Sequence, residues 1–309
     1  IFIGKFIETI HEPFKLMSEI NYSTVQYYLV LILIFIYLSL FVLEKKWPLR
    51  KATRPLLPRL AINFTFTLLV YVIASLFISP LAKATVLFTF SHDFGLLSML
   101  PFNQWVVFIL GFLLMDLSFY YWHALNHKLP LLWRFHVVHH ADPDLDVSTA
   151  MRFHCVEIMY SSLFRLVQLG LIGVSPLLFF CYEFFFQAHT FFQHSNIKLP
   201  FRFERLINKI IVTPRMHGIH HSNYLNETNS NYGVVFSFWD RLHQTIKLDI
   251  PQQAIIIGVP GYSKPSDNSL IRLLLMPIKA QRHYWQIKKD FHFSRKSKTS
   301  DKKVRTLCE

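Results

Sequence analysis

Four long apolar stretches dominate this sequence and restrict the folds that the chain can adopt. They lie at residues 25–43, 60–80, 105–122 and 158–192. A helix needs about 20 predominantly apolar residues to cross the ~30 Å hydrocarbon core of a bilayer, and each stretch reaches roughly that length. Charged residues make up only 17% of the chain, against about 25% in a typical soluble domain. We therefore predict an all-α integral membrane protein, with a bundle of about four to five transmembrane helices.

The fourth apolar stretch is too long for a single span, and Gly173 and Pro176 interrupt it near its middle. We interpret it as a helical hairpin that returns to the side from which it starts. Arg165 and Glu183 are costly in lipid and should face the bundle interior, where an ion pair is as reasonable as a functional role. Residues 81–90 are apolar but short, so they could continue the second span or form an interfacial helix.

The distribution of positive charge predicts the orientation of the spans. Residues 45–59 include six Lys and Arg residues and no acid, whereas residues 84–104 contain no Lys or Arg. Because cytoplasmic loops are enriched in Lys and Arg, we place the first loop in the cytoplasm and the amino terminus on the opposite side. Residues 198–309 contain 19 Lys and Arg against 8 Asp and Glu, a net charge of +11. They should form a cytoplasmic helical cap.

The net charge of +13 could indicate a nucleic-acid partner. In a membrane protein it is explained more simply by a basic cytoplasmic face beside anionic lipid, so we predict no nucleic-acid binding. The three cysteines are odd in number and scattered, and they imply no disulfide framework.

Three histidine clusters stand out in the polar parts of the chain. They read His123-x3-His127, His136-x2-His139-His140 and His217-x2-His220-His221. Residues i, i+3 and i+4 share one face of a helix, so each cluster could aim two or three imidazoles at one point. Imidazole suits Fe, Zn, Cu and Ni, and one tetrahedral zinc needs only four ligands. Eight histidines therefore predict two metals or one crowded site.

The first cluster follows directly after the third apolar stretch, so the metals should lie where the spans enter the cap. Metals held mainly by nitrogen, with exchangeable coordination positions, could bind O2 and attack an unactivated C–H bond. A lipid chain could then reach them sideways from the membrane, and electrons could arrive from the water side.

The clusters and the residues around them resemble the fatty acid hydroxylase / sterol desaturase superfamily of membrane di-iron oxygenases. The resemblance extends over roughly residues 116–247, most closely to bacterial members and to the alkylglycerol monooxygenase branch. Its further motifs are Asp116, Leu132-Trp133-Arg134-Phe135-His136, residues 148–154 with Glu157, Gln193-His194-Ser195-Asn196, Thr213-Pro214-Arg215-Met216-His217, Asn231-Tyr232-Gly233 and Trp239-Asp240-Arg241-Leu242.

The resemblance implies a di-iron centre, O2 as co-substrate, and a lipid or sterol that is hydroxylated or desaturated. It also implies further ligands between the second and third clusters, for which His194 and then His154 are the candidates. The implied metal ligands are thus His123, His127, His136, His139, His140, His154, His194, His217, His220 and His221. Because no flavin or nicotinamide fingerprint is visible, we expect a separate electron donor: a reductase, ferredoxin or cytochrome.

Five more residues are candidates for orienting the imidazoles from outside the metal ligands. They are Asp116, Glu157, His189, Asn196 and Asp240. His189 precedes His194 by five residues, which is about 140° around a helix, so it could be a ligand or an outer partner. The other four could equally serve as helix caps or in salt bridges.

The expected domain organisation has three parts. Residues 1–104 form an N-terminal membrane region with two spans and an interfacial helix. Residues 105–248 form a fatty acid hydroxylase-like catalytic domain, and residues 249–309 form a basic cytosolic region. Within these parts we expect amphipathic surface helices at 1–22 and at 271–287, the latter broken at Pro277, and a disordered tail over the last twenty residues.

Two other functions are compatible with clustered histidines. A zinc-dependent membrane hydrolase is one, although the chain has no His-Glu-x-x-His motif. A metal-binding or haem-binding membrane protein without enzymatic activity is the other. A transporter would place such residues at mid-membrane depth, whereas these clusters lie at the ends of spans and in loops.

Overall fold

A computed structural model describes residues 22–285, and in this range the chain is helical. Its longer helices are α2 (Tyr22–Lys46), α3 (Leu56–Ile73), α4 (Ser79–Ser91), α5 (Gln104–Lys128), α6 (Pro130–His140), α7 (Cys155–Ile172) and α8 (Pro176–His194). The described residues contain no strand, only three isolated bridges. The expected amphipathic helix at 1–22, apart from Tyr22, and the expected disordered tail lie outside the described residues.

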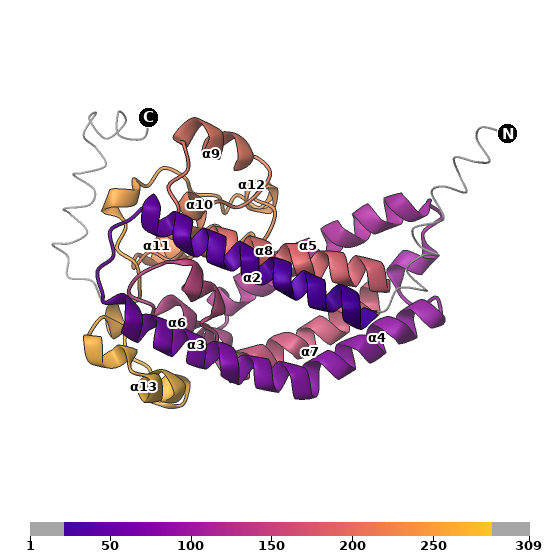
Figure 1. The fold of residues 1–309 in the computed structure, drawn as a ribbon, viewed down its shortest axis with the longest axis horizontal. Helices are drawn as coiled ribbons and strands as arrows, with labels where there is room; N and C mark the ends of the chain where they lie inside the picture. The colour runs from indigo at the N-terminus through magenta and orange to yellow at the C-terminus, as the bar shows by residue number, and fades with distance from the viewer. Residues whose placement is uncertain (1–21, 286–309) are drawn as a thin grey trace.

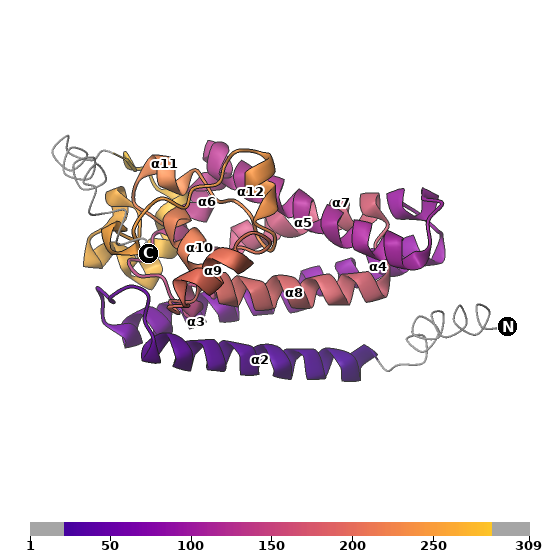
Figure 2. The ribbon, with the colours of Figure 1, turned by 90° about the horizontal axis from the view of Figure 1, so that it is seen from above.

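The longer helices form an elongated bundle, and the short helices gather at one of its ends (Figures 1 and 2). We call this end the cap and define it as residues 129–151 and 195–285. Besides α6 it contains the 3₁₀ turn η3 (Val147–Met151), α9 (Phe201–Ile207), α10 (Pro214–His220), α11 (Leu225–Thr228), α12 (Phe238–Leu242), η4 (Gln252–Ala254), η5 (Pro260–Tyr262), η6 (Pro265–Asn268), α13 (Leu270–Leu275) and η7 (Met276–Ile278).

Four helical segments are long and apolar enough to cross a membrane. They are Val25–Lys46, Leu56–Met99, Gln104–Lys128 and Cys155–Ile172. Large apolar side chains on the outside of the bundle, among them Phe35, Leu68 and Phe88, are exposed. Soluble monomers rarely expose contiguous apolar surface of this extent, whereas helices that contact lipid do. The chain is a multi-pass membrane protein, as its apolar stretches predict.

The apolar residues 81–90 continue the second span and do not form a separate interfacial helix. α3 passes through a π-helical turn, η1 (Ala74–Ile78), directly into α4. Pro80 lies at the start of α4. Proline lacks the N–H of an ordinary helical hydrogen bond, and a wider turn next to it relieves the mismatch. Figure 1 shows the change of direction between α3 and α4 at this turn.

α7 and α8 form the hairpin that the fourth apolar stretch predicts. α7 ends at Gly173, whose φ of 77° lies in the left-handed region that glycine adopts without strain. The outer ends of the hairpin, at Glu157 and His194, each contact a histidine of α6, so both ends lie at the cap. A single kinked helix would have placed them far apart.

Arg165 and Glu183 face the interior of the bundle, as expected. The Nη2 atom of Arg165 lies 2.6 Å from Oε1 of Glu183. The guanidinium also lies over the ring of Phe119, 4.0 Å from its centroid. α5 is central to this interior, because buried Met115 and Phe119 pack with residues of both arms of the hairpin.

The helix expected at 271–287 is shorter in the structure. α13 and η7 end together at Ile278, and residues 279–285 are not helical. Pro277 terminates the helix because it cannot donate the next backbone hydrogen bond. Beyond it, the guanidinium of Arg282 donates to Asp267 at 2.8 Å and to the Gly261 carbonyl at 2.7 Å, which holds this segment against the cap.

Candidate metal centre

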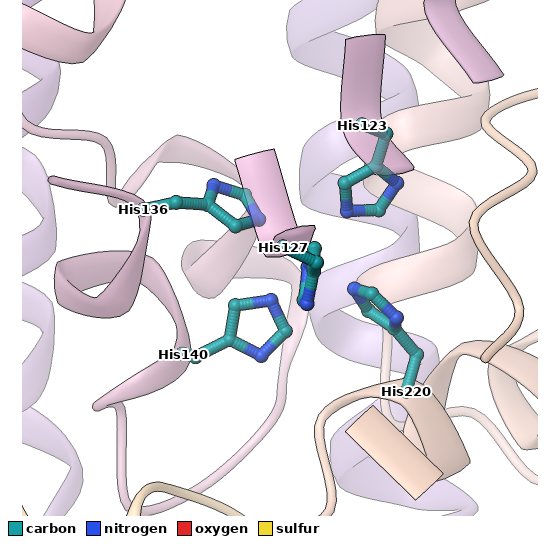
Figure 3. Close-up of side chains that lie close together, drawn as sticks. All are labelled: His123, His127, His136, His140 and His220. Carbon is teal, nitrogen blue, oxygen red and sulfur yellow. The ribbon is translucent and has the colours of Figure 1, made fainter. Parts of the chain in front are cut away.

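Nine histidines gather into two adjacent groups where the bundle meets the cap. Site A consists of His123, His127, His136, His140 and His220, and site B consists of His139, His194, His217 and His221. Within each group, one nitrogen of every ring lies within 4.8 Å of those of the others. Figure 3 shows the five rings of site A converging from α5, α6 and α10. The predicted dimetal arrangement thus has two distinct sets of donors.

Two short helices contribute to both sites. Consecutive residues of a helix point about 100° apart, so His139 and His140 on α6 turn to different sides and serve different sites. At α10, His217 on the helix and His221 directly after it belong to site B, whereas His220 belongs to site A. Each cluster thus aims two of its imidazoles at one site, within the two or three that were expected, and the second and third clusters each give their remaining ring to the other site.

The nitrogens of site B are spaced as ligands of one metal would be. Nε2 of His194 lies 3.1 Å from Nε2 of His139 and 2.9 Å from Nε2 of His217, and Nε2 of His217 lies 3.1 Å from Nε2 of His221. For metal–nitrogen bonds of about 2.1 Å, neighbouring ligand atoms are separated by roughly 3.0–3.4 Å. The donor spacing of site B fits a transition-metal ion.

Site A contains buried ring nitrogens without hydrogen-bond partners among the described residues. Both nitrogens of His127 and of His140 are unpaired, as are Nε2 of His136 and Nε2 of His220. Buried polar atoms are normally hydrogen-bonded, and exceptions call for an explanation. A metal ion at the point where the rings converge would satisfy one nitrogen of each ring. The residues of both sites therefore fit bound metals.

Hydrogen bonds from Nδ1 orient four of the nine rings. The acceptors cannot donate, so Nδ1 must carry the proton, and Nε2 is left with a free lone pair for a metal. The pairs are His123 with the Tyr232 carbonyl at 2.9 Å, His136 with Glu157 Oε1 at 2.6 Å, His194 with the Thr190 carbonyl at 2.8 Å, and His220 with the Ser230 carbonyl at 2.8 Å.

Burial keeps five of the rings outside the spans uncharged. Desolvation, followed by repulsion from neighbouring imidazoles, places the pKa of His139, His140, His217 and His221 well below the usual value. Burial lowers the pKa of His220 to about 3. These imidazoles are therefore neutral at pH 7, which is the form that binds metals. An all-imidazole donor set suits Fe, Zn, Cu or Ni and does not suit Mg or Ca.

His154, expected to be a metal ligand, lies outside both groups. Its Nδ1 accepts a hydrogen bond from the Val156 N–H at 3.2 Å and so caps α7. Its Nε2 lies 3.2 Å from the Leu274 carbonyl. With both nitrogens engaged, this ring connects the hairpin to the end of α13. His189 is buried on α8 and belongs to neither group.

Five residues were expected to orient the imidazoles from outside the metal ligands. In the described part of the chain, Glu157 is the one among them that is hydrogen-bonded to a ring of either site. Asp240 acts one step further away: it accepts the Tyr232 N–H at 2.8 Å, and the Tyr232 carbonyl is the partner of His123. Asp116 accepts hydrogen bonds from two backbone amides and from Trp239, and thus anchors the segment around Tyr232.

Asn196 fixes the loop that follows α2 and does not contact an imidazole through a hydrogen bond. Its Oδ1 accepts the Arg50 N–H at 2.9 Å, and its Nδ2 donates to the Arg50 carbonyl at 2.8 Å. The sequence does not predict that the backbone carbonyls of Thr190, Ser230 and Tyr232 form hydrogen bonds with the candidate ligand rings. A backbone carbonyl leaves no side-chain signal, although Tyr232 lies within one of the motifs that carry the resemblance.

Comparison with known proteins supports the resemblance that the histidine motifs suggest. Residues 108–245 match the model of the fatty acid hydroxylase family, and this range includes all nine histidines of the two sites. This part of the chain is similar to the fatty acid hydroxylase family. The resemblance of its histidine motifs is thereby confirmed.

Relatives within this superfamily act on several lipids. The chain is 31% identical over 166 residues to the ornithine lipid hydroxylase OlsE of Rhizobium tropici, covering 52% of this chain and 48% of that protein. It is 27% identical over 189 residues to alkylglycerol monooxygenase of Danio rerio (61% and 40%) and 27% identical over 141 residues to human cholesterol 25-hydroxylase (44% and 49%). The matches thus span about half or less of these relatives. No solved structure matches the chain.

Proposed function

We propose that this chain is a membrane-bound, O2-dependent di-iron oxygenase that hydroxylates or desaturates a C–H bond of a lipid or sterol. The observation that carries the proposal is the pair of adjacent all-histidine groups at the end of a bundle of apolar helices. Hydroxylases and monooxygenases that are named for lipids and sterols are among its relatives, which supports the same reaction class.

In this proposal the five rings of site A and the four rings of site B hold one iron each. Irons held there would supply the activation of O2 and the oxidation of an unactivated C–H bond. The protein keeps the rings of His139, His140, His217, His220 and His221 neutral by burying them. It fixes the direction of four rings through hydrogen bonds at Nδ1. Glu157 holds the proton on Nδ1 of His136, so that Nε2 of this ring remains free to bind iron.

The surroundings of the sites support access from both the membrane and water. The apolar helices that lead to the sites allow a lipid to approach from the bilayer. The basic loop between α2 and α3 supports a cytoplasmic location for the cap, with the amino terminus on the opposite side. A separate reductase, ferredoxin or cytochrome would deliver electrons to this side.

The decisive experiment measures metal content and O2 uptake on the detergent-purified chain, with and without added iron and a reductant. We expect two irons per chain and O2 uptake that requires the reductant. Bound zinc alone decides nothing, because zinc often replaces iron in such sites. A zinc hydrolase would not consume O2, and absence of uptake after iron loading would overturn the proposal.

A further inference from the structure

A cavity of about 480 Å³ lies beside the metal centre. The loop between α2 and α3, the segment after α6 and residues 255–263 enclose it. Ala141, which follows the histidines of α6, and Asn223, two residues beyond His221, both line it. Its volume is within the ~300–1,000 Å³ of typical small-molecule sites. None of the nine histidines lines it, so it is separate from the metal sites.

Arg50 lines this cavity and has no carboxylate partner among the ion pairs of the described residues. Its Nη1 donates to Gln252 Oε1 at 2.6 Å, but its Nε and Nη2 are buried and have no hydrogen-bond partner within residues 22–285. Burial lowers the pKa of Arg50 to about 10, so the guanidinium stays charged at pH 7. Nε and Nη2 form the edge of a guanidinium that binds carboxylate or phosphate with two parallel hydrogen bonds.

The acidic residues of the cavity wall are already engaged elsewhere. Asp144 accepts the backbone N–H groups of Thr53 and Arg54, and Asp146 pairs with Arg59 at 2.7 Å. Lys51 and Arg54 also line the cavity, and in the described part of the chain neither forms an ion pair. The cavity is therefore lined by three cations that form no ion pair among the described residues.

The remaining wall is apolar, and the cavity lies at the end of two spanning segments. Leu145, Ile256 and Val259 contribute apolar surface to it. Lys45, near the end of the first span, and Leu56, at the start of the second, mark its position along the bundle. Headgroups lie at the ends of spanning helices, so we expect the cavity to lie at their level. A ligand with an anionic group and an apolar remainder fits such a wall.

We infer that this cavity binds the anionic headgroup, phosphate or carboxylate, of the lipid that the protein oxidises. Arg50, Lys51 and Arg54, which all line the cavity, supply the positive charge that attracts the anion. The inference rests on the proposed function in taking a lipid as substrate. It adds that this substrate is an anionic lipid whose headgroup is held beside the metal centre.

The test measures lipid binding by the detergent-purified full chain through the shift in thermal unfolding, and it requires no turnover. The probes are dihexanoyl phosphatidic acid, N-dodecanoylglycine, uncharged dihexanoylglycerol and inorganic phosphate. We expect both anionic lipids to bind about tenfold or more tightly than dihexanoylglycerol, because a charged hydrogen-bonded pair contributes that much. Arg50→Gln should abolish this preference, and Arg50→Lys should retain part of it.

Lys128→Gln is the matched control, because it removes one exposed charge at the end of α5 outside the cavity, and it should keep the preference. If Arg50→Gln fails to fold, the double variant Lys51→Gln/Arg54→Gln should weaken the binding of both anionic lipids several-fold. Equal binding of charged and uncharged lipids by the unmodified chain would overturn the inference, as would a shift that inorganic phosphate produces equally well. Because binding is read without oxidation, absence of O2 uptake would count against the proposed function alone.

Discussion

His139 and His140 are consecutive residues of one helix, yet they belong to different metal sites. We expect His140→Ala to lower the metal content of site A and His139→Ala to lower that of site B. Each variant should therefore retain about half of the metal of the unmodified chain, because the remaining donors of the other site are untouched. Metal analysis of the purified variants after reconstitution with iron checks this expectation.

His154→Ala is the control for these two variants. Its ring caps α7 and contacts the Leu274 carbonyl, outside both sites, so the variant should retain its full metal content. Loss of metal from His154→Ala would show instead that His154 is a ligand. Equal and complete loss from His139→Ala and His140→Ala would contradict the division of α6 between two sites.

Glu157 is the carboxylate that orients His136, with 2.6 Å between Nδ1 and Oε1. Glu157→Gln keeps the size of the side chain but removes the negative charge that favours the proton on Nδ1. Loss of such a partner typically lowers metal affinity or activity about 10–100-fold. Competition with a chelator should reveal this loss in Glu157→Gln, while Asp249→Asn, at an exposed carboxylate, should behave like the unmodified chain.

The spacing of the histidines alone predicts that they bind metal, but not how they are shared. The i, i+3, i+4 pattern places neighbouring rings on one side of a helix. It does not predict that His139 and His140 belong to two different sites. That division depends on where α8 and α10 deliver His194 and His220, which is set by tertiary packing. His154 illustrates the same limit, since a ring that caps a helix and a ring that binds iron have the same sequence signal.

At the scale of the elements, one arginine connects the second span to the loop that follows α6. Arg59 on α3 pairs with Asp142 and Asp146, each at 2.7 Å, and its side chain is 6% exposed. Arg59→Met would remove the closest cation from these buried carboxylates, and we expect it to destabilise the protein by about 3–5 kcal/mol. Thermal unfolding in detergent measures the effect.

Lys45→Met provides the comparison for Arg59→Met. Lys45 also lies near Asp146, at 3.9 Å, but its side chain is 43% exposed. Exposed pairs contribute only about 0–1 kcal/mol. This variant should therefore unfold at a temperature close to that of the unmodified chain. Similar unfolding of both variants would mean that the Arg59 pairs contribute little to stability.

The elements themselves could largely be predicted, because span length and helix breakers are local properties of the sequence. The apolar runs, the hairpin turn near Gly173 and the inward-facing Arg165 and Glu183 all follow from such properties. The helix end at Ile278 and the bend between α3 and α4 are harder to predict from the sequence. They depend on how Pro277 and Pro80 are accommodated, and a proline can either end a helix or bend it.

At the scale of the whole molecule, the two sites join helices that are far apart in the sequence. α5, α6, α8 and α10 all supply rings, so bound metals would cross-link the bundle to the cap. We expect removal of metal with a chelator to lower the unfolding temperature, because a ligand that binds only the folded state stabilises it. Fe²⁺ or Zn²⁺ should restore the temperature, whereas Mg²⁺ should not, because Mg²⁺ prefers oxygen ligands. An unchanged unfolding temperature after complete metal removal would contradict this expectation.

The position of His123 along α5 bears on which carbon of a substrate is oxidised. Between Gln104 and His123 the helix rises about 28 Å at 1.5 Å per residue, close to the ~30 Å thickness of the hydrocarbon core. The metal centre therefore lies near one boundary of the core, roughly 15 Å from the bilayer midplane. A lipid in the nearer leaflet has its polar end at that boundary and its terminal methyl groups near the midplane. The carbons within reach of the metals are then those next to the headgroup, and we expect the new oxygen or double bond there rather than at the far end of the chain.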